Sequence, residues 1–226
     1  ESAKGDPLLT YVNFAMHAQC AGGLEFTADY PFALGESLKV RGAGMLTMFS
    51  IGAAGNINPV HLKLARPIAG HPRAARIGTI LAAEVLKTYA RLQPVTEPAI
   101  GVRSEIVSLP LASTAPGAEE PARQVAARFG KPGQPPFLEL VNASKVLDVS
   151  AREGKPHEAE VQVVSLGKQV AWVAIPGEYF TELGIAIKRA SPYPCTVVVE
   201  LANGSIGYIP NRKAYQEGHY EAVSAR

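Results

Sequence analysis

Cysteine is scarce in this chain, which has only Cys20 and Cys195 among its 226 residues. Two cysteines exclude a disulfide framework and a zinc site built from thiolates, and leave open a single bridge between them. The sequence also lacks a run of about 18 apolar residues, the length that a membrane-spanning helix needs. Lysine and arginine form no dense stripe, and the formal net charge is +2. Nucleic acid is therefore not an expected partner.

The residues that are abundant describe a globular protein with many turns. Hydrophobic residues make up 47% of the chain and charged residues 19%, which is ordinary for a globular fold. The length suffices for a substantial core, and 18 prolines and 21 glycines exclude a helical bundle. The chain has no initiator methionine, and its first residues lack the basic-then-apolar profile of a signal peptide. We therefore expect a fragment or processed form of a longer protein.

Apolar runs rich in β-branched residues alternate along the chain with segments of helical periodicity. The apolar runs predict buried strands at residues 8–16, 45–51, 99–109 and 196–201. Alternating runs at residues 158–165 and 169–175 flank a short turn and predict a hairpin. Helices are predicted at residues 27–40, 72–92, 122–129, 137–151 and 180–190. This order predicts an α/β fold, a three-layer domain in which helices flank a mixed sheet.

We expect a single domain over residues 1–226, with a proline-rich surface insertion at residues 110–136. The insertion is polar and separates a predicted strand from a predicted helix. An excursion over a binding site is the alternative interpretation of the same residues.

Three groups that can bind a metal or move a proton follow the ends of apolar runs. His17 ends the first run, Glu178 follows the Pro-Gly turn at residues 176–177, and Tyr208 follows Gly207. Ligands and catalytic groups gather at the carboxyl edge of open α/β sheets. His17 is either a metal ligand or base, or a half-buried histidine bonded at a strand end. Glu178 is predicted to open a helix, either as an ionised functional group favoured by the helix dipole or as a simple cap.

The segment Gly55-Asn56-Ile57-Asn58-Pro59 forms a loop after the second predicted strand. It lacks the lysine and the serine or threonine of a P-loop, and the three glycines of a dinucleotide fold. Asn56 and Asn58 either hold the turn together or donate hydrogen bonds to an oxyanion. No serine or cysteine of the chain lies in a nucleophile elbow.

Five short motifs follow one another along the chain. They are Phe14-Ala15-Met16-His17, Thr27-Ala28-Asp29, Gly55-Asn56-Ile57-Asn58-Pro59, Pro176-Gly177-Glu178, and Gly207-Tyr208 with Tyr220-Glu221-Ala222. The step from Tyr208 to Tyr220 is 12 residues. In this order and spacing, the chain resembles the neutral, non-lysosomal ceramidase family over about residues 10–225.

The resemblance implies a zinc-dependent amide hydrolase that cleaves the N-acyl bond of ceramide, or of a related lipid amide, by metal-activated water. It implies that Zn²⁺ is bound by His17, Glu178 and Tyr208, and that Tyr220 steadies the tetrahedral oxyanion. A lipid amide as substrate implies peripheral contact with a membrane. The resemblance also implies a secreted, periplasmic or cell-surface protein.

Two departures from the family pattern concern the same site. The family's other zinc histidine lies upstream of the position that matches His17, and this chain begins too late to contain it. Where the family has the motif Gly-Asp-Val-Ser-Pro, this chain has Asn56 at the position of the aspartate and Asn58 at the position of the serine. We expect Asn58 to act in catalysis by orienting substrate or water, and Asn56 and Asp29 to bind substrate. The alternatives are a non-catalytic ceramidase-like binding module and a hydrolase of a different amide or ester.

Overall fold

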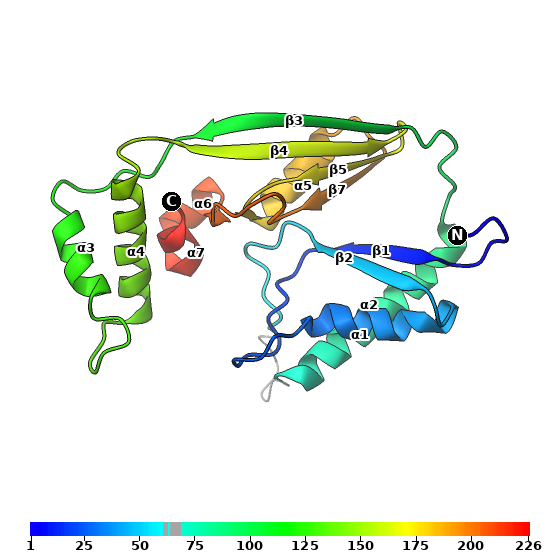
Figure 1. Ribbon diagram of the computed structural model, residues 1–226, viewed down its shortest axis with the longest axis horizontal. Helices are drawn as coiled ribbons and strands as arrows, with labels where there is room; N and C mark the ends of the chain where they lie inside the picture. The colour runs from blue at the N-terminus through cyan, green and yellow to red at the C-terminus, as the bar shows by residue number, and fades with distance from the viewer. Residues whose placement is uncertain (61–62, 64–68) are drawn as a thin grey trace. The chain divides into compact units, whose positions relative to one another are not determined.

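The computed structural model describes residues 1–60, 63 and 69–226 (Figure 1). The chain separates into two compact units, each with its own strands, helices and core. Unit 1 comprises Glu1–Gly52 and Ile57–Pro98, and unit 2 comprises Ala53–Asn56 and Ala99–Arg226. The single domain and the surface insertion expected from the sequence stay predictions.

Unit 1 combines a pair of parallel strands with two helices. Strand β1 (Leu9–Phe14) pairs in parallel with β2 (Leu46–Ile51). Parallel strands need a crossover between them, and here α1 (Asp29–Leu38) and the 3-10 turn η1 (Lys39–Arg41) provide it. Helix α2 (His71–Thr88) follows β2 and ends in a second 3-10 turn, η2 (Tyr89–Arg91).

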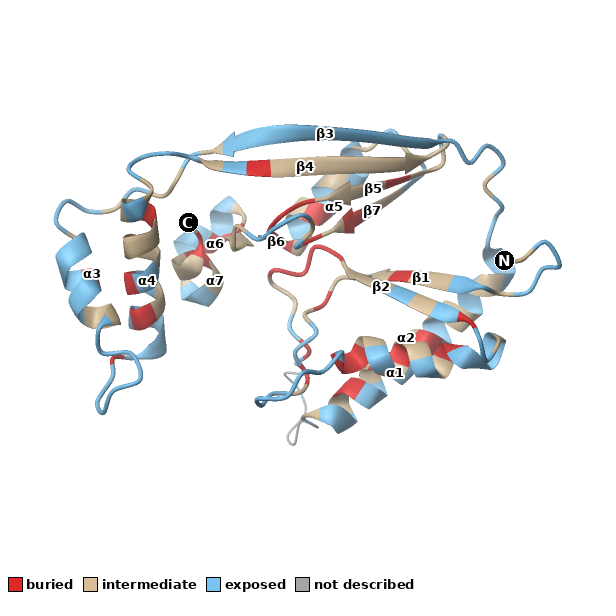
Figure 2. Cartoon of the chain, viewed as in Figure 1, coloured by how far each residue is buried: buried red, intermediate tan, exposed pale blue. Residues whose placement is uncertain are grey.

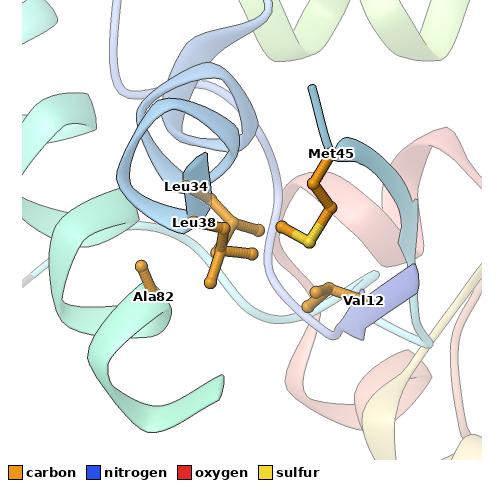
Figure 3. Packing of buried hydrophobic residues seen from close by; sticks show 5 residues of the cluster. All are labelled: Val12, Leu34, Leu38, Met45 and Ala82. Atoms are coloured by element: carbon orange, nitrogen blue, oxygen red, sulfur yellow. The ribbon is translucent and has the colours of Figure 1, made fainter. Parts of the chain in front are cut away.

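The core of unit 1 lies where β1 and the two helices meet. Its buried cluster consists of Val12, Leu34, Leu38, Met45 and Ala82 (Figure 3). Leu34 and Leu38 are four residues apart, so they lie on one face of α1 and point to the strands together. This packing fixes α1 against the two strands.

The two helices of unit 1 approach each other closely at Gly78. A Cβ atom on Gly78 would lie 2.5 Å from the carbonyl oxygen of Tyr30 and 2.6 Å from the amide nitrogen of Leu34. Only glycine permits backbones to come this near. The crossing of α1 and α2 therefore depends on the absence of one side chain.

Unit 2 is built on a four-stranded mixed sheet in the order β3-β4-β5-β7. Its antiparallel strands are β3 (Ile100–Leu109), β4 (His157–Leu166) and β5 (Val170–Ala174). Strand β7 (Cys195–Val199) pairs in parallel with β5, and α5 (Thr181–Ala190) connects the two. The tight turn between β4 and β5 is the hairpin that the sequence predicts.

The core of unit 2 joins this sheet to α5. Buried Ala53, Ile175 and Val198 pack against half-buried Val161 of β4 and Ile187 of α5. A Cβ atom on Gly184 of α5 would lie 2.4 Å from the Cβ of Ala53. The helix therefore lies directly on the short segment Ala53–Asn56, which the chain contributes to unit 2 from far upstream.

The remaining elements of unit 2 are four helices and one pair of two-residue strands. Helices α3 (Glu119–Ala126) and α4 (Phe137–Ala151) pack against each other, and α3 lies within residues 110–136. Strand β6 (Glu178–Tyr179) pairs in parallel with β8 (Tyr208–Ile209). Helices α6 (Arg212–Glu217) and α7 (His219–Ser224) close the unit, and α7 packs on α4 and β8.

The α/β class and the mixed sheet predicted from the sequence are confirmed. The sequence did not predict β6, β8, α6 or α7, all of which have six residues or fewer. Cys20 and Cys195 are both free thiols, so the bridge that the sequence left open does not form. Within the part of the chain that is described, no helix is both long and apolar enough to cross a membrane.

Candidate functional site

His17 lies just beyond the end of β1 in unit 1. The residue is half-buried. Its backbone N–H donates to the carbonyl oxygen of Ile57 at 3.0 Å. Ile57 belongs to the loop after β2, so the segments beyond the carboxyl ends of both parallel strands are joined at His17. This is the edge of a parallel pair where functional groups are expected.

Asp29 stands at the start of α1 and is buried, with 4% of its surface exposed. One carboxylate oxygen accepts the N–H of Ala21 at 2.9 Å, and the other accepts the N–H of Tyr30 at 2.8 Å. Its backbone has a φ of 55°, a strained conformation for a residue with a side chain. Asp29 thus ties the segment that follows His17 to α1. The substrate contact predicted for Asp29 stays a prediction.

The buried Cys20 thiol hydrogen-bonds the Asp29 carboxylate. Burial, and then the hydrogen bond to the Asp29 carboxylate, raises the pKa of Cys20 to about 12. A thiol with this pKa stays protonated at neutral pH and is a poor nucleophile. Cys20 is therefore not a candidate nucleophile.

Asn58 is an exposed residue of the loop after β2 in unit 1. The Gln19 side-chain amide donates a hydrogen bond to its Oδ1 atom. Gln19 lies two residues beyond His17, so Asn58 is linked to the His17 segment by a side chain as well as by the neighbouring backbone bond. The Arg73 guanidinium further fixes this loop by donating to the carbonyl oxygen of Pro59 at 3.1 Å.

Glu178 does not open a helix, contrary to the sequence prediction. It lies in the two-residue strand β6, and α5 begins only at Thr181. Its backbone N–H donates to the carbonyl oxygen of Gly207 at 2.9 Å, and its register partner across the strand pair is Tyr208. The pairing with β8 directs Glu178, so the helix dipole argument does not apply.

Glycines allow other backbone segments to pass close to Glu178. A Cβ atom on Gly55 would lie 2.5 Å from the Glu178 carbonyl oxygen. A Cβ atom on Gly177 would lie 3.1 Å from the carbonyl oxygen of Gly207. Side chains at either position would push apart the three segments that meet here. The close packing of these segments therefore requires glycine at positions 55 and 177.

Tyr208 contacts Glu178 and Tyr220, the two other residues of unit 2 to which the resemblance gives a role in catalysis or metal binding. Its hydroxyl hydrogen-bonds the Glu178 carboxylate. Its ring meets the ring of Tyr220 edge-on, with centroids 5.6 Å apart. Burial first, then the charge and hydrogen bond of Glu178, raises the pKa of Tyr208 above its ordinary value. A direct contact thus joins Glu178 and Tyr208, which are 30 positions apart in the chain.

Tyr220 lies on α7 and continues this row of aromatic rings. It stacks on Phe137 at the start of α4, with centroids 5.7 Å apart and an interplanar angle of 26°. Tyr220 therefore contacts two aromatic neighbours, Tyr208 and Phe137. Phe137 is not among the site residues that the sequence predicts, because its position directly after a proline-rich stretch carries no chemical signal.

Asn56 belongs to unit 2, and its side chain is engaged at the start of α5. Its Oδ1 accepts the N–H of Thr181 at 2.8 Å, and its Nδ2 donates to the Glu182 carboxylate at 3.0 Å. The N–H of Thr181 is one of the unsatisfied donors at a helix start. Asn56 therefore holds its loop on α5, and its contact with substrate stays a prediction.

Glu200 is the functional-site neighbour that the sequence analysis missed. It follows β7, is 4% exposed, and accepts the N–H of Ala54 at 3.0 Å and the N–H of Tyr179. Its other oxygen, Oε1, has no hydrogen-bond partner among the described residues. Burial raises the pKa of Glu200 to about 7. A glutamate at the end of a β-branched run was the available signal, because charges are rare in buried strands.

The structure thus brings three of the predicted site residues into contact: Glu178, Tyr208 and Tyr220. Asn56 also belongs to unit 2, where its side chain bonds Thr181 and Glu182, and His17, Asp29 and Asn58 belong to unit 1. Over the described ranges, no group of three histidine, cysteine, aspartate or glutamate side chains could hold a metal ion. Tyrosine, the third type of ligand that the resemblance implies, is not one of these four residue types.

Comparison with known proteins finds similarity in structure only. No family model matches the chain, and no curated protein matches it in sequence. Neutral ceramidase from Pseudomonas aeruginosa is similar with a TM-score of 0.71 and 18% identity. A ceramidase complexed with C2 is similar with a TM-score of 0.70 and 18% identity. Both comparisons cover 98% of this chain, which spans 41% and 43% of those two chains.

These comparisons define the class of the fold. The chain is an α/β protein with a mixed sheet, and candidate functional groups follow the ends of its strands. More particularly, its fold is ceramidase-like over nearly all of its length, and it corresponds to about two fifths of a ceramidase chain.

Proposed function

We propose that this chain is part of a zinc-dependent hydrolase that cleaves the N-acyl bond of a ceramide-like lipid amide. The contact of Glu178, Tyr208 and Tyr220 is the observation that carries the proposal. These are the residues that the resemblance selects as two metal ligands and an oxyanion donor. Their assembly from β6, β8 and α7, on a ceramidase-like fold, supports that selection.

The donor groups fit a zinc ion chemically. Glutamate carboxylates and histidine nitrogens are common zinc ligands, and Tyr208 presents a phenol oxygen to the same carboxylate. The proton in the Tyr208–Glu178 hydrogen bond is the one that a cation would displace. Glu178 and Tyr208 come from unit 2, whereas His17 comes from unit 1 and enters the proposal through the resemblance. Bound zinc would polarise the amide carbonyl and lower the pKa of the attacking water.

Tyr220 is assigned the role of hydrogen-bond donor to the oxyanion. Its ring contacts the rings of Tyr208 and Phe137, which favour one position of the side chain. A fixed donor costs no reorganisation when charge develops, and one such donor typically contributes about 3 kcal/mol. Tyr220 lies beside Tyr208, the proposed metal ligand, where a hydrogen-bond donor to the oxyanion is required.

The remaining roles concern the substrate. Asn58 is exposed and is assigned the orientation of substrate or water. Asn56 and Asp29 are assigned substrate binding, although in this structure their side chains bond Thr181, Ala21 and neighbouring groups. A lipid amide would be met at a membrane surface. The secreted, periplasmic or cell-surface location implied by the resemblance belongs to the same proposal.

Zinc stoichiometry tests the proposal directly. We expect about one zinc per molecule by elemental analysis of the whole hydrolase of which this chain is proposed to be part, lost in Glu178→Ala and in His17→Ala. The control is His71→Ala, which removes an exposed histidine at the start of α2 and leaves the zinc content unchanged. Full zinc content in both ligand variants would contradict the assignment. Hydrolysis of a panel of lipid amides and esters then defines the substrate.

A non-catalytic ceramidase-like binding module is the second candidate. The position of Asn56 favours it, because both polar groups of this side chain are engaged by α5. A wild-type protein that folds, binds a lipid amide and contains no zinc would establish this alternative. A zinc protein that hydrolyses only esters or other amides would establish the third interpretation.

A further inference from the structure

Strand β3 is an unusually long and uncovered edge of the unit 2 sheet. It is the outermost strand in the order β3-β4-β5-β7 and pairs, among the described residues, with β4 alone. Nine of its ten residues are exposed, and Figure 2 draws β3 in the pale blue of exposed residues. Ile100 is 76% exposed, and Val102 and Ile106 are each 59% exposed. Apolar edges of this length invite pairing with another strand.

The hydrogen-bonding groups of β3 alternate between β4 and the open edge. Gly167 N–H donates to the carbonyl oxygen of Ala99 at 2.8 Å. In an antiparallel ladder, this bond directs the backbone groups of the odd-numbered residues 99–107 toward β4. The even-numbered residues 100–108 therefore direct their N–H and C=O groups outward. Their side chains share one face of the sheet, where Ile100, Val102 and Ile106 lie.

The sequence of β3 is complementary to itself about Ser104. Arg103 and Glu105 flank Ser104 and share the other face of the strand. If a second copy of β3 pairs antiparallel with Ser104 opposite Ser104, each Arg103 faces Glu105 of the second copy. Val102 then faces Ile106 in the same way. Opposite charges and β-branched residues are both favourable cross-strand pairs.

The backbone agrees with this register. Pairing Ser104 with Ser104 places even-numbered residues opposite even-numbered residues, and these are the ones whose backbone groups point outward. Both charged pairs then fall at the closer, non-hydrogen-bonded positions. A shift by one residue would remove this match. The complementarity therefore holds in the backbone and in the side chains at once.

We propose that β3 is the interface of a homodimer, in which two copies join their four-stranded sheets edge to edge. The two-fold arrangement explains why opposite charges lie at equal distances from Ser104, since an isologous interface must match its own sequence. Strand β3 contains no proline and no lysine, its register with β4 is uninterrupted, and its charged residues are Arg103 and Glu105. The dimer is independent of the proposed activity.

Charge reversal tests the interface by sedimentation or light scattering over a range of concentrations. We expect a dimer for the wild type. Arg103→Glu and Glu105→Arg each place like charges opposite one another in both symmetric pairs, and each should raise the dimer dissociation constant at least about tenfold. The double variant Arg103→Glu/Glu105→Arg should return to within about threefold of the wild type, because the pairs are restored with reversed sign.

Lys213→Glu on α6 is the matched control, because it changes the net charge as Arg103→Glu does at an exposed site away from β3. It should leave dimerisation unchanged. Amide exchange gives a second measurement: Val102, Ser104 and Ile106 should become protected as concentration rises, while the amides facing β4 do not change. A wild type that stays monomeric, or a dimer that neither single reversal weakens, would overturn the proposal.

Discussion

At the scale of single residues, two buried carboxylates organise the candidate site. Within the described part of the chain, Asp29 and Glu200 are the buried charged side chains. Each accepts a backbone N–H from a segment that follows a strand of unit 1, at Ala21 and Ala54 respectively. Buried carboxylates are costly unless such donors compensate them. Asp29 and Glu200 therefore hold the loops at Ala21 and Ala54 in place by hydrogen bonds to the loop backbone.

Glu200 makes stability depend on pH. Burial raises its pKa from 4.5 to about 7, so the folded protein holds a proton that the unfolded chain releases. The free energy of unfolding therefore falls between about pH 4.5 and about pH 7, and the full cost of about 3 kcal/mol is present above that range. Glu200→Gln cannot ionise and keeps an oxygen for the Ala54 N–H. We expect it to be more stable than the wild type at about pH 8 and nearly equal to it at about pH 4.

Denaturant unfolding of both proteins at these two pH values measures the difference. Glu139→Gln, at an exposed position of α4, controls for the loss of one negative charge. An equal stability difference between wild type and Glu200→Gln at both pH values would show that Glu200 does not titrate in this range.

Tyr220 tests the oxyanion assignment. Tyr220→Phe keeps the ring contacts with Tyr208 and Phe137 and removes only the hydroxyl. We expect kcat for lipid amide hydrolysis to fall by about 100-fold or more, while the zinc content stays the same. Tyr215→Phe, on α6 and 56% exposed, is the matched control and should retain full activity. A fully active Tyr220→Phe enzyme would remove Tyr220 from the reaction.

At the scale of elements, Gly78 decides how α1 and α2 cross. Alanine is the better helix former, yet a Cβ at Gly78 would meet the Tyr30 carbonyl oxygen at 2.5 Å, inside the backbone of the neighbouring helix. We expect Gly78→Ala to lower the free energy of unfolding by about 1–3 kcal/mol, because the helices must separate. Thermal or denaturant unfolding measures it.

Gly35 is the matched control for Gly78. It lies inside α1, and its Cβ would meet Thr47 at an ordinary 3.5 Å. Gly35→Ala should therefore raise stability by up to about 1 kcal/mol through the unfolded chain. Two glycine-to-alanine changes in neighbouring helices would then have opposite signs. If both stabilise, the close approach at Gly78 is not a constraint.

The elements of the fold differ in how far the sequence predicts them. The helix at residues 137–151 and the hairpin of β4 and β5 follow from periodicity and turn residues, which are local. Strands β6 and β8 have two residues each and show no period. They exist because Glu178 and Tyr208 are held together by the surrounding packing. The same fact explains why Glu178 was wrongly placed at a helix start.

At the scale of the whole molecule, the ceramidase-like fold was accessible from the sequence only through the order of short motifs. No family model or curated sequence matches, whereas the solved structures match over 98% of the chain at 18% identity. Packing constrains backbone geometry more strongly than residue identity. The fold therefore persists where sequence similarity is too low to detect, and the dimer proposed at β3 is a property of this chain's own residues.

The sequence by itself determined the α/β class, most of the longer helices and strands, and the candidates His17, Glu178, Tyr208 and Tyr220. These depend on periodicity, turn chemistry and residue type, which neighbouring positions encode. Only the tertiary structure decided that Tyr208 bonds Glu178 and that Glu200 is buried beside them. Such contacts join positions far apart in the chain, and they are set by hydrogen bonding and close packing in the folded state, which no local pattern records.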